Sequence, residues 1–151
     1  MYIFCIPAGG TNPFMTWTKK MNSDKKIAVL DLPGRGRKFR ETPINNISLL
    51  ADTLIKDMEK INTDSDDYAI FGYCSGALVA YEICRKLQAD GKKLPVHFFT
   101  FGIGAPDSKN LISKSHDRTT SPEFKMMVSQ FFNIGSLGSI EEAERAVNTY
   151  I

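Results

Sequence analysis

Residues 68–87, YAIFGYCSGALVAYEICRKL, decide the fold of this chain. The apolar run at 68–71 predicts a buried strand, and the residues after Ser75 are apolar around most of a helical surface. The turn between them is GYCSG at 72–76, with two glycines around a central cysteine. Glycines remove side chains where a strand and a helix approach closely. We therefore predict that Cys74 occupies a strained turn at the N-terminus of a helix.

The rest of the first hundred residues predicts alternating strands and helices. Further buried strands are expected at 2–6 and 97–103, and another strand at 25–30. An amphipathic helix is expected at 47–61, and a short helix capped by Asn12 with Pro13 in its first position. Strands that alternate with helices are typical of an α/β fold with a mostly parallel sheet and helices on both faces. This is the fold class that we predict.

The segment after 104–106 differs from the alternating part. Residues 107–120 are polar, and two apolar-faced helices are predicted after them, one opening at Ser121 and one at a Ser139-x-x-Glu142 capping box. Two such helices inserted after a strand could form a lid over a hydrophobic pocket, and we assign 107–151 as a lid region. Ordinary helices of a core layer would give the same pattern.

The composition excludes several classes of protein. The chain has 151 residues, 42% of them hydrophobic and 24% charged, as expected of one globular domain. A net charge of +2 is too small for a nucleic-acid-binding surface. Neither a signal peptide nor an apolar run of membrane-spanning length is present, and three cysteines form no spaced framework. We expect a cytoplasmic protein with no disulfide, no metal and no cofactor.

Four blocks of sequence resemble, in the same order, the type II thioesterases of nonribosomal peptide and polyketide synthesis, a branch of the α/β-hydrolases. The blocks are FCIPAGG at 4–10 followed by Phe14 and Trp17, LPGRGR at 32–37 followed by Glu41 and Pro43, FGYCSGA at 71–77, and GAP at 104–106. The G-x-C-x-G turn corresponds to the G-x-S-x-G nucleophile elbow of these enzymes, with cysteine where serine is usual. The resemblance covers the chain well to about Pro106.

The resemblance implies hydrolysis of acyl thioesters on the phosphopantetheine arm of an acyl or peptidyl carrier protein. Cys74 is then the nucleophile, and a helix N-terminus stabilises a thiolate. The resemblance assigns the oxyanion hole to the backbone amides of Ser75 and of the 7–9 loop, where we choose Ala8. A buried, inert cysteine is the alternative for Cys74, and the same consideration assigns Cys5 and Cys84 to the core.

Cysteine in place of serine changes the expected energetics, because an acyl-cysteine is still a thioester and stays activated. Acyl transfer to another acceptor therefore remains open beside hydrolysis. The four cations of one short segment, Arg35, Arg37, Lys38 and Arg40, could contact an acidic carrier protein or the phosphate of its arm. We prefer the alternative of a solvated loop whose glycines set a turn.

The acid and the histidine that follow the nucleophile in α/β-hydrolases are placed by the resemblance beyond Ile151. We interpret His97 as a structural strand residue, and His116 with Asp107 as a weak alternative pair. We therefore expect residues 1–151 to be the N-terminal portion of a single thioesterase domain, truncated or split, which a second polypeptide could complete. A carrier-protein-binding module without turnover is the alternative from another functional class.

Overall fold

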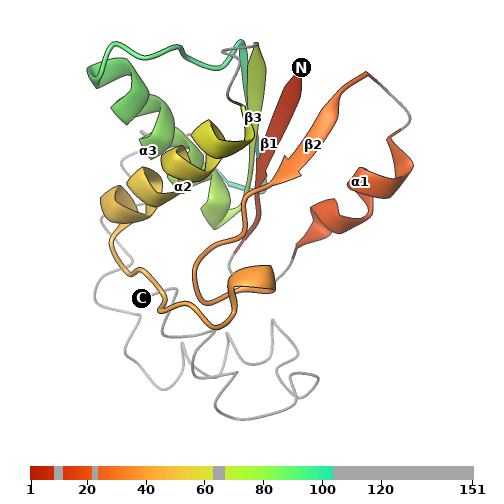
Figure 1. Cartoon of the computed structure of the whole chain (residues 1–151), viewed down its shortest axis with the longest axis horizontal. Coiled ribbons are helices and arrows are strands. Elements are labelled where there is room, and N and C mark those ends of the chain that lie inside the picture. The colour runs from red at the N-terminus through yellow and green to blue at the C-terminus, as the bar shows by residue number, and fades with distance from the viewer. Residues whose placement is uncertain (9–11, 22–23, 63–66, 104–151) are drawn as a thin grey trace. The chain divides into compact units, whose positions relative to one another are not determined.

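A computed structural model describes residues 1–8, 12–21, 24–62 and 67–103 of the chain (Figure 1). Its centre is a four-stranded sheet in the order β2-β1-β3-β4, and every pairing is parallel. The strands are β1 (Tyr2–Ile6), β2 (Lys26–Val29), β3 (Tyr68–Tyr73) and β4 (His97–Phe101). The four predicted strands are confirmed, whereas the expected lid at 107–151 lies outside the described residues.

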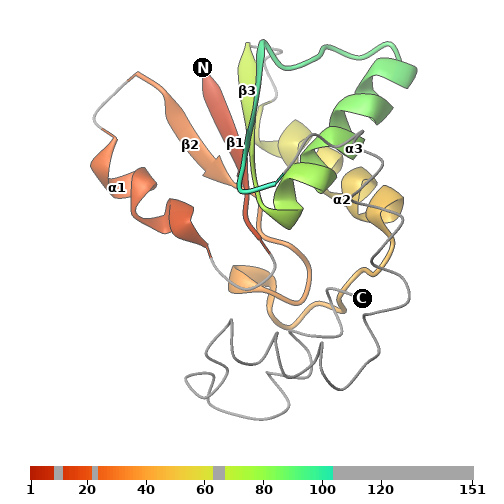
Figure 2. The same ribbon diagram turned by 180° about the vertical axis from the view of Figure 1, so that it is seen from behind.

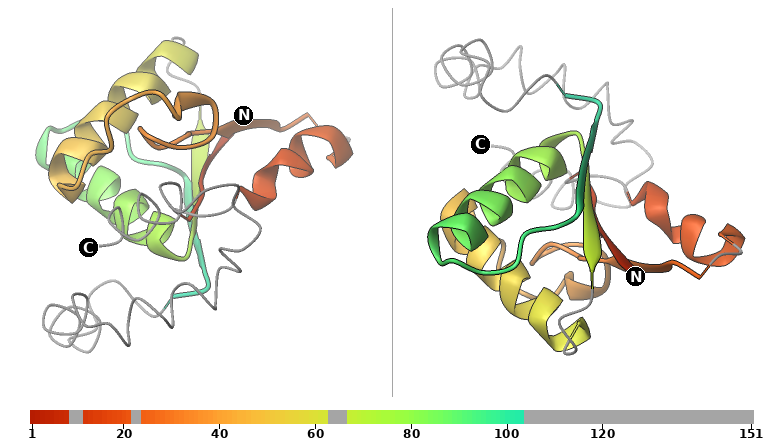
Figure 3. Two further views of the ribbon diagram at one scale, coloured as in Figure 1. Left: turned by 90° about the horizontal axis from the view of Figure 1, so that it is seen from below. Right: turned by 90° about the horizontal axis from the view of Figure 1, so that it is seen from above.

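Helices α2 (Ile47–Ile61) and α3 (Ser75–Ala89) lie side by side on one face of the sheet (Figures 1 and 3). Alternate strand residues, Phe4 and Ile70, point toward this side and are fully buried with Leu54 and Ile83 of the two helices. This cluster is the main core. No helix in the described ranges is long and apolar enough to cross a bilayer.

The opposite face carries a shorter cover made of η1 (Pro13–Met15) and α1 (Trp17–Lys20), seen from behind in Figure 2. The Phe14 amide donates a hydrogen bond of 3.2 Å to Asn12 Oδ1, which confirms the predicted cap. Phe14 packs edge-on against Trp17 and Phe71, and it is almost fully buried. Helices therefore cover both faces, and the predicted α/β class with a parallel sheet is confirmed.

The expectation that 97–103 forms a buried strand is wrong in one respect. A strand is present, but every residue of β4 is exposed, including Phe99 at 46% and Phe101 at 63%. The physical reason is position, because β4 is one of the two edge strands and pairs only with β3 among the described strands. Phe99 and Phe101 stack on Phe71 and Tyr73 with one ring face and leave the rest uncovered.

An exposed, apolar edge strand is a template for pairing with another chain. Replacing Phe99 by lysine should lower the self-association of this 151-residue chain, because a charge opposes pairing at the edge. Light scattering across a concentration series measures the effect. Phe39→Lys, which changes another exposed aromatic residue away from the edge, is the matched control and should leave association unchanged. Equal effects of the two changes would contradict the role of the edge.

Candidate active site

Cys74 occupies the turn between β3 and α3 in a conformation that side chains rarely adopt. Its φ is 51° and its ψ is −123°, and it is the only non-glycine residue with positive φ in the described part of the chain. Such a conformation costs of order 1–3 kcal/mol and persists where the surroundings enforce it. The thiol is exposed. The predicted sharp turn with a projecting central residue is therefore confirmed.

The two glycines of the turn are required by backbone contacts. A Cβ atom at Gly72 would lie 2.4 Å from Cα of Ala77, in the first turn of α3. A Cβ atom at Gly76 would lie 2.4 Å from the carbonyl oxygen of Ile6 and 2.6 Å from that of Pro7. The end of β1 therefore packs directly against the first turn of α3. No other residue type fits at 72 or 76 without a backbone shift.

The two predicted oxyanion donors flank this turn. Ser75 is the first residue of α3, and the first amides of a helix have no acceptor within the helix. Ala8 is buried and directly follows Pro7, whose carbonyl touches the Gly76 position. The Cys74 amide is engaged elsewhere, since it donates a hydrogen bond of 2.7 Å to the Phe101 carbonyl. The structure thus places Ala8 and Ser75 beside the elbow, and their role as donors stays a prediction.

The other two cysteines have a different environment. Cys5 is fully buried, and burial raises the pKa of its thiol to about 12. Burial also raises the pKa of Cys84, which packs against the main core. Cys5 lies in the core as predicted, and Cys84 is partly buried against it. Among the three cysteines, Cys74 is the accessible one.

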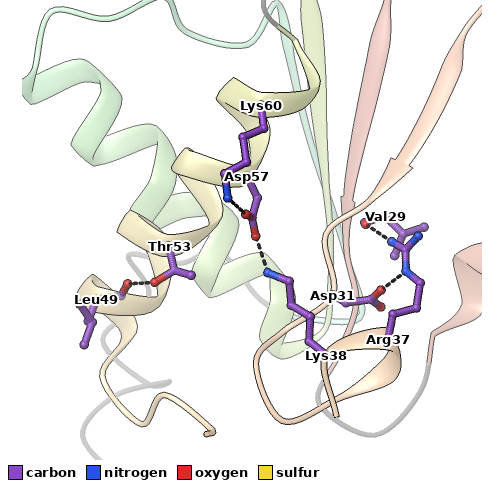
Figure 4. A network of polar contacts seen from close by, with 8 residues as sticks. All are labelled: Val29, Asp31, Arg37, Lys38, Leu49, Thr53, Asp57 and Lys60. Atoms are coloured by element: carbon purple, nitrogen blue, oxygen red, sulfur yellow. Dashed lines mark hydrogen bonds and ion pairs between the residues drawn. The ribbon is translucent and has the colours of Figure 1, made fainter. Parts of the chain in front are cut away.

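The LPGRGR segment forms a loop after β2. Figure 4 shows the contacts of Arg37 in this segment and of Lys38, which follows it. Arg37 Nε donates a hydrogen bond of 2.6 Å to Asp31 Oδ2, and Arg37 Nη2 donates one of 3.1 Å to the Val29 carbonyl. Lys38 forms an ion pair with Asp57 on α2. Arg37 and Lys38 thus have structural partners, and the Arg37 side chain is still 75% exposed. Both observations favour the preferred interpretation of a solvated loop over that of a binding surface.

Asp57 receives a second ion pair of 3.1 Å from Lys60 (Figure 4). Burial acts to raise the pKa of Asp57, but the hydrogen bonds from Lys38 and Lys60 outweigh it and hold this pKa below its ordinary value. The lowered pKa means that the ion pair stabilises the fold above the ordinary aspartate pKa of about 3.9 and is lost as the pH falls further.

Asp31 was not singled out by the sequence-based prediction of the site. It is buried at the end of β2, next to the LPGRGR loop, and it also accepts a hydrogen bond from Asn12. The sequence feature that could have pointed to Asp31 is its place as a lone carboxylate between an apolar strand and a turn with proline and glycine. Charge at such a position is seldom buried unless it is paired.

The described residues hold no histidine near the elbow. His97 begins β4, four residues before Phe101, which is roughly 13 Å away along a parallel strand. Phe101 is the residue of β4 that contacts the Cys74 amide. The predicted structural role of His97 therefore agrees with its position, whereas Asp107 and His116 lie outside the described residues. Within the described ranges, no group of three or more potential metal ligands is found.

Comparison with protein families matches residues 1–149 to the thioesterase domain. The chain belongs to the thioesterase family. The chain is 27% identical over 106 residues to the gramicidin S biosynthesis protein GrsT of Aneurinibacillus migulanus, an overlap of 69% of the chain and 41% of GrsT. It is 31% identical over 121 residues to the probable anguibactin biosynthesis thioesterase AngT of Vibrio anguillarum, which covers 78% of the chain and 48% of AngT.

A solved structure of a related enzyme has the same fold as this chain. RedJ, a thioesterase from the prodiginine biosynthetic pathway in Streptomyces coelicolor, superposes with a TM-score of 0.75 and 30% identity over 97% of the chain and 56% of RedJ. The predicted resemblance and the α/β-hydrolase-like fold are confirmed. The chain spans about half the length of these relatives.

The environments of the three cysteines predict selective alkylation. Near neutral pH, iodoacetamide should modify the exposed Cys74 well before the half-buried Cys84 and leave the buried Cys5 unmodified, because burial raises the pKa of the latter two thiols and limits access to them. Mass mapping of peptides measures the sites, and the same chain in urea should react at all three. Comparable labelling of Cys5 in the folded chain would contradict the burial described above.

The contact of Gly76 with β1 predicts a large effect of a small substitution. Gly76→Ala should lower the free energy of unfolding by about 1–3 kcal/mol or more, because the added methyl group meets backbone that must shift. Urea denaturation measures the change. Gln88→Ala, at an exposed position of the same helix, should stay within about 0.5 kcal/mol of the original chain. An equally small effect of Gly76→Ala would contradict the close approach.

Proposed function

We propose that this chain carries the nucleophile and the oxyanion hole of a thioesterase that hydrolyses acyl thioesters on the phosphopantetheine arm of carrier proteins in nonribosomal peptide or polyketide synthesis. The observation that carries the proposal is the exposed Cys74 in a strained turn at the start of α3, flanked by Ala8 and Ser75. The names of AngT and RedJ as biosynthetic thioesterases support the substrate class.

The first step is transfer of the acyl group to Cys74. The thiolate attacks the thioester carbonyl carbon, and the carbonyl oxygen becomes an oxyanion that the amides of Ala8 and Ser75 stabilise by hydrogen bonds. The bond between the carbonyl carbon and the pantetheine sulfur then breaks, and the pantetheine thiolate leaves and takes up a proton. One thioester is exchanged for another, so the step is close to thermoneutral.

The second step is hydrolysis. Water attacks the acyl-Cys74 carbonyl, the bond to the cysteine sulfur breaks, and a carboxylic acid and the free thiol are released. The cysteine itself favours a second candidate activity, because a thioester intermediate stays activated toward other nucleophiles. Acyl transfer to an acceptor thiol or amine would use the same intermediate.

General acid and base assistance is typically worth about 10²–10⁴-fold in rate. The described residues place no histidine beside Cys74, so we propose that acid and base come from outside them. The exposed edge of β4 is where we propose that further polypeptide joins the sheet, from a second chain or from additional sequence. The Phe101 carbonyl of β4 already holds the elbow, so this edge adjoins the site.

The test is to incubate the folded chain with an acyl-pantetheine and to follow both the free pantetheine and the intact protein mass. We expect release of pantetheine with an acyl adduct at Cys74, because the exposed thiol is the accessible nucleophile of the three cysteines. Cys74→Ala should abolish both signals.

Cys84→Ala is the matched control, since it removes a half-buried thiol on the same helix, and it should retain both signals. Absence of adduct and of released pantetheine in a folded sample would overturn the proposed catalysis. Binding of an acyl carrier protein that persists in Cys74→Ala, without turnover by the unmodified chain, would identify a binding module instead.

A further inference from the structure

Asp31 is the only buried charged residue among those that the structure describes, with 6% of its side chain exposed. It follows β2 and therefore lies at the carboxyl end of the parallel sheet, the end that also carries Cys74. A buried carboxylate is costly unless it is paired and hydrogen-bonded. Asp31 therefore has to be stabilised by donors in its immediate surroundings.

Each oxygen of Asp31 has its own donor. Arg37 Nε lies 2.6 Å from Oδ2, and Asn12 Nδ2 lies 3.3 Å from Oδ1. The second glycine of the LPGRGR loop makes room for this arrangement, since a Cβ atom at Gly36 would lie 2.5 Å from Asp31 Oδ1. The loop therefore leaves room for this carboxylate, and its Arg37 supplies the cation that neutralises it (Figure 4).

Asn12 connects this network to the proposed oxyanion loop. Its Oδ1 accepts the Phe14 amide and its Nδ2 donates to Asp31, so both ends of the amide group are engaged. Ala8 precedes Asn12 by four residues, and the chain just before Ala8 packs against Gly76. Pro7, which directly precedes Ala8, is thus held against the elbow, and Asn12, four residues after Ala8, is held by its hydrogen bond to Asp31.

We propose that Asp31 and Asn12 are positioning residues, whose mutual hydrogen bond holds the Ala8 amide where the thioester oxyanion forms. The LPGRGR loop then acts on catalysis through Asp31: Gly36 admits the carboxylate and Arg37 neutralises it. This inference rests on the proposed function of Cys74 and adds how the second oxyanion donor is kept in place. An oxyanion donor that is displaced loses most of its effect, because its value depends on preorganised geometry.

The test separates oxyanion stabilisation from thiol reactivity. Acylation of Cys74 by an acyl-pantetheine passes through an oxyanion, whereas alkylation by iodoacetamide displaces iodide at a methylene carbon and forms none. Asn12→Asp keeps the oxygen that accepts the hydrogen bond of the Phe14 amide. It replaces the NH₂ group that donates to Asp31 by a second carboxylate oxygen, so the hydrogen bond becomes a repulsion between two carboxylates. We expect acylation to slow by roughly 10- to 100-fold while alkylation keeps its rate.

Two further variants make the test specific. In the double variant Asn12→Asp with Asp31→Asn, the amide donor and the carboxylate acceptor exchange places, so the hydrogen bond can form again. This double change should restore most of the acylation rate. Asn46→Asp is the matched control, because Asn46 caps α2 through the same type of bond, 2.9 Å from its Oδ1 to the Leu49 amide. It adds the same charge at another helix start and should change neither rate.

The outcomes distinguish this inference from the proposed function. Selective loss of acylation in Asn12→Asp, with rescue by the double change, supports the positioning role. Unchanged acylation in Asn12→Asp, equal slowing of both reactions, or no rescue would overturn it while the acylation of the unmodified chain still stands. If the unmodified, folded chain is not acylated at all, the proposed function fails, and the positioning role fails with it.

Discussion

The structure depends on the close contact between the first turn of α3 and the end of β1. Because Gly76 has no side chain, the carbonyl groups of Ile6 and Pro7 come within van der Waals distance of the helix start. This contact holds the helix start against the sheet, directly after Cys74, whose backbone has positive φ. It also brings the segment with Ala8 beside the nucleophile. One packing constraint thereby assembles strand, helix and the proposed oxyanion hole.

A network of hydrogen bonds and ion pairs connects the end of β2 to its neighbours. The buried carboxylate of Asp31 joins Asn12 to the LPGRGR loop, and Lys38 of the same loop is tied to Asp57 on α2. Arg37 and Lys38, two cations of the basic cluster, thus have structural partners within the fold, although the Arg37 side chain stays largely exposed. The physical reason is the cost of a buried charge, which has to be met by nearby donors.

Burial separates the chemistry of the three cysteines. Cys5 and Cys84 are shielded by the core and have raised pKa values, whereas Cys74 stands at an exposed helix start. The exposed strand β4 adjoins the proposed nucleophile, because the Phe101 carbonyl accepts a hydrogen bond from the Cys74 amide. A polypeptide that paired with the edge of β4 would therefore lie close to Cys74.

The order of strands and helices, the turn at Cys74 and the cap at Asn12 could be predicted from the sequence, because each depends on neighbours within a few residues. The partnership of Asn12 with Asp31 could not, since 19 positions separate them and only the parallel alignment of β1 and β2 brings their ends together. The exposure of β4 likewise escaped prediction. An apolar run indicates a strand, but whether that strand lies at the centre or the edge of a sheet depends on which other segments pair with it, and only the tertiary structure decides this.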